Sequence, residues 1–104
     1  MRIEFLYWEE CPSHAEALAR LRAVLADEGL DVPVEVIHVS TEEQARTEHF
    51  PGSPTIRING SDIQQPLDRH LGLTCRAYRT DDGRISPLPT RTMIRRALRA
   101  ARPI

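Results

Sequence analysis

Residues 3–14 read IEFLYWEECPSH, and this stretch decides the fold that the rest of the sequence must complete. The run Ile3–Trp8 is short, apolar and rich in aromatic residues, which predicts a buried strand. Pro12 then favours the first turn of a helix, because its fixed φ angle suits that position and no needed N–H group is lost. The sequence therefore places Cys11 between a strand and the start of a helix.

The residues that follow predict a β-α-β unit. Apolar side chains recur at helical spacing, so we expect a helix over residues 12–28 with Gly29 as its C-cap. The segment Val32–Val39 is rich in β-branched residues and predicts a second strand. Pro33 cannot donate a backbone hydrogen bond, so this strand is expected at a sheet edge. Two strands joined by one helix are parallel, with a right-handed connection. The helical stripe consists of Leu18, Leu21 and Leu25.

A second helix and a third strand are predicted next. Residues 40–44 carry overlapping capping-box signals for a short helix, which must end before Pro51. Residues 53–58 read as a turn followed by an alternating strand, and Asn59-Gly60 ends that strand.

The last part of the sequence predicts a loop, a strand and a helix. Residues 61–74 are polar and interrupted by proline, which indicates a long loop. Residues 75–80 predict a fourth strand. Residues 93–101 carry an amphipathic pattern, which predicts a C-terminal helix capped by Thr90 or Thr92. The predicted order is β-α-β-α-β-β-α.

This order, with Cys11-Pro12 opening the first helix and Ser53-Pro54-Thr55 opening the third strand, resembles the thioredoxin-like superfamily. The chain is similar to its small bacterial members, with Cys-Pro-x-His in place of Cys-x-x-Cys. The resemblance implies an α/β fold with a central four-stranded mixed sheet flanked by helices. It also implies a cis peptide bond before Pro54, in a turn that faces Cys11 and presents the backbone of Ser53 to a bound peptide or thiol. The substrate-binding residues it implies are Pro12, Ser13, Ser53, Pro54 and Thr55.

The sequence departs from the superfamily at its redox pair, because no second cysteine follows Cys11 within one helical turn. A thiolate, not a thiol, attacks disulfides. At an ordinary pKa near 8.5, about 3% of a cysteine is ionised at pH 7. A helix N-terminus favours a negative charge by roughly 0.3–1 kcal/mol, which would lower the pKa of Cys11 by about one unit at most.

His14 is the candidate partner of this sulfur. It lies three residues after Cys11 and hence on the same face of the first turn. A protonated His14 within ~4–6 Å would lower the pKa of Cys11 further, and it could also protonate a leaving thiol. Glu9 and Glu10 act in the opposite direction through like-charge repulsion. The alternatives are that His14 faces solvent and that Cys11 is a buried, inert thiol.

Cys75 is a candidate second thiol. In the predicted topology its strand begins at the end of the sheet away from Cys11, roughly 15–20 Å off at about 3.3 Å per residue. A disulfide needs Cα atoms within about 7 Å, so we expect a buried structural thiol. The loop over residues 61–74 leaves another position open.

Composition bounds the function classes. The 104 residues suit one domain, predicted over residues 1–104, with a net charge of −1. The first 50 residues hold eleven acidic and four basic side chains, and the remainder hold four and ten. No apolar run approaches the ~20 residues of a membrane helix. No signal peptide is visible, so we expect a cytoplasmic protein without a membrane partner. The arginines of the last helix lack interleaved aromatic residues and indicate a solvated face, so nucleic acid is not an expected partner.

We therefore interpret the chain as a thiol-dependent redox protein that acts by a monothiol route through Cys11, with thiol–disulfide oxidoreductase as the candidate enzyme class. Its partner would be a disulfide-bearing protein or a low-molecular-weight thiol such as a glutathione-like molecule, and a homodimer is compatible with the sequence. One alternative is a protein that binds mercury or a related soft metal through Cys11, His14 and Cys75. The other is a thioredoxin-like binding module without catalysis. We expect no cofactor and no dedicated metal site, because the other histidines show no ligand spacing.

Overall fold

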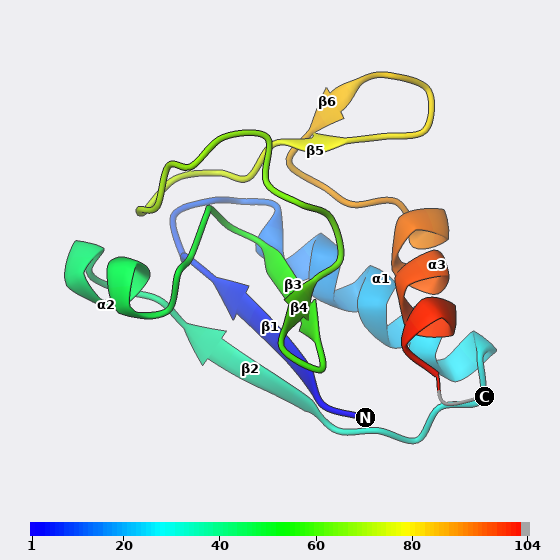
Figure 1. Cartoon of the computed structure of the whole chain (residues 1–104). Helices are drawn as coiled ribbons and strands as arrows, with labels where there is room; N and C mark the ends of the chain where they lie inside the picture. Colours follow the sequence, from blue (N-terminus) through cyan, green and yellow to red (C-terminus); the bar gives the residue numbers. More distant parts are fainter. Residues whose placement is uncertain (103–104) are drawn as a thin grey trace.

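The computed structural model describes residues 1–102 and contains a four-stranded mixed sheet with three helices (Figure 1). The strand order is β2-β1-β3-β4; β1 is parallel to β2 and antiparallel to β3, and β4 is antiparallel to β3. The α/β fold class is therefore confirmed, and the arrangement is consistent with a thioredoxin-like one. The edge position of β2, which Pro33 predicted, is confirmed as well. In chain order the elements are β1 (Ile3–Tyr7), α1 (His14–Asp27), β2 (Val34–His38), α2 (Glu42–Thr47), β3 (Thr55–Ile58), β4 (Ser61–Asp62), β5 (Tyr78–Arg79), β6 (Ile85–Ser86) and α3 (Arg91–Ala101).

Helices cover both faces of the sheet, and the alternation along β1 divides its side chains between them. Ile3 and Phe5 pack on the face that α1 and α3 cover, where these two helices lie side by side in Figure 1. Leu6 points to the opposite face and packs with Val39, Ala45 of α2 and Phe50. Complete burial stabilises the fold by roughly 1.5–3 kcal/mol for each large apolar side chain. The larger core, between the sheet and the α1–α3 pair, includes Leu21, Val24, Ile56, Ile94 and Leu98.

The fourth strand of the sheet differs from the prediction. We expected it at residues 75–80, but β4 follows β3 after a turn of two residues and pairs with the end of β3. The turn residues Asn59 and Gly60 have φ angles of 53° and 84°. Positive φ at both central residues is what a type I′ hairpin turn requires, and Asn-Gly adopts it readily. Of the predicted strand only β5 remains, and it pairs with β6 in a separate hairpin.

The helix ends follow the sequence signals with one shift. α1 begins at His14, two residues later than predicted, so Pro12 precedes the helix. Gly29 follows the end of α1 with a φ of 66°, the left-handed conformation that glycine adopts without strain. The predicted caps of the other helices are confirmed: the Thr41 and Thr90 hydroxyls accept hydrogen bonds from backbone N–H groups three residues later, at 3.0 and 3.1 Å.

The arginines of α3 bind the acidic end of α1. Arg95 lies 3.4 Å from Asp27, and the Arg99 guanidinium donates to both carboxylate oxygens of Glu28 at 2.7 and 3.2 Å. The hydrogen bond from Arg99 holds the pKa of Glu28 below its usual value, and Glu28 raises the pKa of Arg99. The basic face expected to be solvated is thus partly engaged in ion pairs between two helices.

Acid is expected to weaken this link between α1 and α3. The folded-state pKa of Glu28 is lowered, so its contribution to the free energy of unfolding is present above the unfolded-state pKa. That contribution is lost as the pH falls through the folded-state pKa. Glu28→Gln should therefore be less stable than the wild type near pH 7, and the difference should vanish in strong acid. Urea unfolding over a pH series measures this, with Glu35→Gln on the exposed edge strand as the control. A difference that does not change with pH would contradict the assignment.

Candidate functional site

Cys11 and Cys75 form a disulfide, with Cα atoms 5.6 Å apart. Cys11 lies in the connection between β1 and α1 and is completely buried, whereas Cys75 lies in the segment between β4 and β5 and is exposed. This corrects two expectations from the sequence: Cys75 is neither remote from Cys11 nor a buried thiol. The bond joins residues that are 64 positions apart.

The chain reaches Cys11 because β4 is so short. After β4 ends at Asp62, residues 63–74 run without regular pairing back toward the connection between β1 and α1 (Figure 1). At about 3.3 Å per residue these twelve residues can span roughly 40 Å, which exceeds the 15–20 Å separation that the simple topology imposed. The predicted loop therefore exists, but it carries Cys75 to the other end of the sheet.

Ser53 connects the two cysteine-bearing segments. Its backbone N–H donates to the Thr74 carbonyl, and its own carbonyl accepts from Arg76 N–H, both at 2.8 Å, in a parallel bridge centred on Cys75. Cys11 Sγ lies 3.4 Å from the same Ser53 carbonyl oxygen. The Ser53 hydroxyl accepts a hydrogen bond from Trp8 N–H at 2.9 Å. One fully buried residue therefore fixes the segments on either side of the disulfide.

Gly52 allows this close approach. Its φ is 140°, and a Cβ atom added there would lie 3.0 Å from both Cα and N of Arg76. Contacts of this length are tighter than nine in ten real Cβ contacts, so a side chain at Gly52 would require the backbone beside Cys75 to give way by a few tenths of an ångström. Because Gly52 has no side chain, the backbone of residues 75–76 can lie directly against the turn before β3.

Arg76 clamps the Cys75 segment onto the sheet. Its guanidinium binds both carboxylate oxygens of Asp62 at 3.0 and 3.1 Å and donates to the Gln64 carbonyl at 2.8 Å. It also donates to the Thr55 hydroxyl at 3.2 Å and lies 4.4 Å from the ring centroid of Tyr78. The Arg76 side chain is only 2% exposed. A buried charge needs a partner of opposite charge, and Asp62 is that partner.

Tyr78 covers the remaining sequence-predicted residues of the turn. Its hydroxyl donates to the Pro54 carbonyl at 2.7 Å, and burial raises the pKa of this phenol. Pro54 and Thr55 are both buried. The Ser53–Pro54 peptide bond, which the resemblance implied to be cis, has the cis form. The predicted substrate-binding residues Ser53, Pro54 and Thr55 are thus brought together, and the protein's own chain covers them.

The residues after Cys11 have different environments. Pro12 is exposed, and Ser13 is the N-cap residue of α1 but makes no side-chain capping bond. The His14 ring stacks on the Tyr7 ring with centroids 4.7 Å apart, and His38 stacks on Tyr7 at 5.0 Å. The predicted effect of His14 on the Cys11 sulfur remains a prediction.

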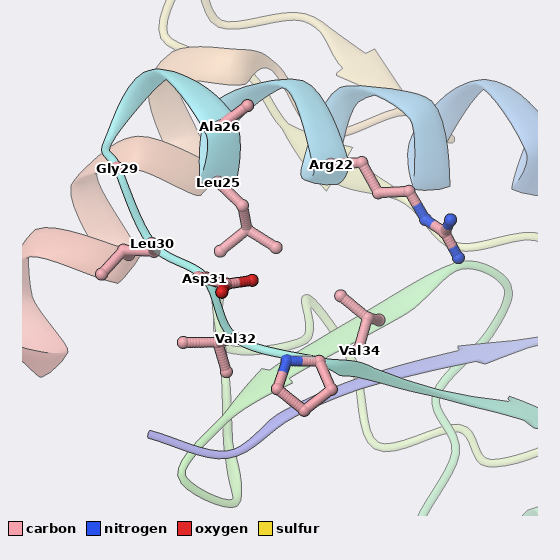
Figure 2. A pocket seen from close by; sticks show the side chains of 9 residues that line it. Arg22, Leu25, Ala26, Gly29, Leu30, Asp31, Val32 and Val34 are labelled. Atoms are coloured by element: carbon pink, nitrogen blue, oxygen red, sulfur yellow. The ribbon is translucent and has the colours of Figure 1, made fainter.

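A small cavity adjoins Cys75, and a larger one lies elsewhere. The small cavity has a volume of about 110 Å³. Its lining comprises Pro51, Pro66, Leu67, Asp68, His70, Thr74, Cys75, Arg76 and Ala77. The larger cavity, about 630 Å³, lies between the end of α1 and the start of β2, where Leu25, Val32 and Val34 border it (Figure 2). The predicted site residues lie outside its lining, so it does not belong to the disulfide site.

Within residues 1–102, no group of three or more His, Cys, Asp or Glu side chains is arranged to hold a metal ion. No helix in the same described range is long and apolar enough to span a bilayer.

The residues that fix Cys75 were not predicted from the sequence; they are Asp62, Gln64, Arg76 and Tyr78. One signal was present: an arginine directly after Cys75 interrupts a segment interpreted as a strand. A buried arginine needs a carboxylate partner. Asp62, one of only four acidic residues in the second half of the chain, was a candidate.

Comparison with known proteins gives one family. The model of the family described as "Domain of unknown function (DUF2703)" matches residues 12–98, which include Ser53 and Cys75. No curated protein and no solved structure matches the chain.

Removing the Arg76 side chain should destabilise the fold. Arg76→Ala leaves the Asp62 carboxylate without its buried partner, and breaking such a pair costs about 3 kcal/mol or more. Arg79→Ala, at an exposed position in the adjoining strand, is the matched control and should change the free energy of unfolding by less than about 0.5 kcal/mol. Urea unfolding of the oxidised proteins measures both values. Equal losses in the free energy of unfolding of the two variants would show that the buried Arg76 side chain stabilises the fold no more than an exposed arginine does.

Proposed function

We propose that this chain, which belongs to the DUF2703 family, carries out thiol–disulfide exchange through the pair Cys11 and Cys75. The observation that supports this most strongly is the disulfide between a cysteine just before α1 and an exposed cysteine in an irregular segment. The monothiol route expected from the sequence assumed that Cys75 was out of reach. A second thiol within bonding distance makes a two-cysteine cycle the better proposal.

The position of Cys11 has two opposing effects on its sulfur: complete burial, the alternative that the sequence left open, disfavours the thiolate, and the place just before α1 favours it. Cys11 lies three residues before the first residue of α1, where the helix dipole favours negative charge. Exposed disulfides are also more readily reduced than buried ones, and one half of this disulfide is exposed.

In the reduced protein one cysteine thiolate attacks an external disulfide RSSR, which forms a protein mixed disulfide and releases RS⁻. The other cysteine then attacks the protein sulfur of that mixed disulfide, which forms the Cys11–Cys75 bond and releases a second RS⁻. The external disulfide gains two electrons and the cysteine pair loses them. Two molecules of an external thiol, such as a glutathione-like molecule, reverse the reaction.

We further propose that the fold is a member of the thioredoxin-like superfamily. The sheet order β2-β1-β3-β4, the helices on both of its faces and the cysteine that precedes α1 support this. The turn Ser53-Pro54-Thr55 faces Cys11, as expected for such a protein.

The test of the function is the reduction potential of the disulfide. We expect a midpoint potential between about −270 and −120 mV, the range of proteins that exchange disulfides, from alkylation in glutathione redox buffers. Cys11→Ser and Cys75→Ser should each block the catalysed reduction of a small disulfide by external thiol. The two variants are matched, because each retains one of the two sulfurs.

A purely structural disulfide predicts different results. Its potential would lie below about −300 mV, and glutathione would leave it closed. Either result, or full turnover by one of the single-cysteine variants, would overturn the two-cysteine cycle.

A further inference from the structure

The two halves of the disulfide differ in how an external molecule can reach them. Cys11 is completely buried, and its sulfur lies 3.4 Å from the carbonyl oxygen of Ser53. Cys75 is exposed and contributes to the wall of the 110 Å³ cavity. Exchange requires the attacking thiolate to contact the sulfur directly. Access therefore distinguishes the two sulfurs before any difference in their chemistry is considered.

Resting on the proposed function, we infer that a small external thiolate opens the disulfide by attack on Cys75 Sγ, with the Cys11 sulfur as the leaving group. The cavity beside Cys75 receives the attacking molecule. The thioredoxin-like resemblance implied the opposite, namely that the cysteine before the helix contacts the substrate. Here that sulfur is the internal one.

The step balances without an additional oxidant or reductant. An external thiol loses its proton to solvent, and its thiolate RS⁻ attacks Cys75. The Cys75–SR bond forms, the Cys11–Cys75 bond breaks, and its electron pair leaves on Cys11. The start of α1 favours that negative charge, whereas the burial of Cys11 opposes it, so the thiolate then takes up a proton. Once protonated, the Cys11 thiol can donate a hydrogen bond to the Ser53 carbonyl. A second RS⁻ then attacks the external sulfur, which releases RSSR and the Cys75 thiolate.

The backbone around Cys75 should hold the mixed disulfide in place. Thr74 and Arg76, on either side of it, bind the two peptide groups of Ser53 at 2.8 Å. Neither bond involves a sulfur, so both can persist when the disulfide opens. Cys11 and Cys75 then remain close enough for the bond to form again.

The cavity favours a small thiol. Its 110 Å³ is well below the roughly 300–1,000 Å³ of pockets that take drug-sized ligands. This difference favours a small ligand over a drug-sized one. Pro51, Pro66 and Leu67 supply apolar walls, and Asp68 and His70 supply polar ones. A molecule of the size of cysteine matches this space better than a peptide does.

Mapping the first adduct tests the inference. Oxidised wild-type protein is mixed with L-cysteine, quenched rapidly with acid, alkylated with N-ethylmaleimide at low pH and digested. Mass spectrometry should locate the added cysteine on the Cys75 peptide and the maleimide on Cys11. An adduct on Cys11 with a free Cys75 would overturn the inference and leave the proposed function standing. A disulfide that L-cysteine does not open would overturn both.

Filling the cavity gives a second measurement. Ala77→Trp places a large ring in its lining, and opening by L-cysteine should slow by roughly tenfold or more because the attacking thiolate is displaced. Ala19→Trp places the same ring on the exposed face of α1 and should open at the wild-type rate. Circular dichroism checks that both variants are folded, and the mapping above does not depend on either variant. Equal rates for both would overturn the role of the cavity.

Discussion

The site depends on the peptide groups of one buried residue, Ser53. Its N–H and carbonyl bind the segment that carries Cys75, and its hydroxyl binds the connection that carries Cys11. An unpaired buried peptide group costs free energy comparable to a lost hydrogen bond, so neither segment can leave without a penalty. The disulfide therefore joins two segments that the backbone already holds side by side. Gly52 leaves room for the backbone of residues 75–76 beside the turn before β3. The ion pair between Arg76 and Asp62 holds that segment in place.

Local signals predicted most of the fold, and the exception is instructive. The strand before Cys11 and the edge strand after Pro33 depend on neighbouring residues, and both were predicted. The helix after Cys11 was predicted as well, but it begins two residues later than expected, and Thr41 and Thr90 are the caps among the residues that the capping signals left open. The fourth strand was misplaced because Asn59-Gly60 was interpreted as the end of a strand when it is the turn of a hairpin. Because of that single misinterpretation, Cys75 was expected at the end of the sheet away from Cys11.

The contacts around Cys75 could not be derived in the same way. Arg76 binds Asp62 and Gln64 across a segment without regular pairing. Such a segment has no periodic sequence pattern from which its path, and hence its contacts, could be predicted. Ser53 was singled out as a backbone that a bound peptide would contact. Instead its peptide groups bind the chain's own residues 74 and 76. An added peptide strand cannot use those groups while the segment stays docked, so the fold leaves access to Cys75 but not to the backbone beneath it.

The uneven distribution of charge along the chain has a consequence for the unfolded state. The acidic first half and the basic second half meet in the folded protein, where Arg95 and Arg99 bind Asp27 and Glu28. Before folding, the two halves are tethered polyions of opposite sign, and they attract each other over a distance of about 10 Å at 0.1 M salt. Denatured chains are seldom fully expanded, and this attraction draws the ends of this one together. Dilute buffer should therefore yield a contracted unfolded ensemble, which swells as added electrolyte screens its opposite charges.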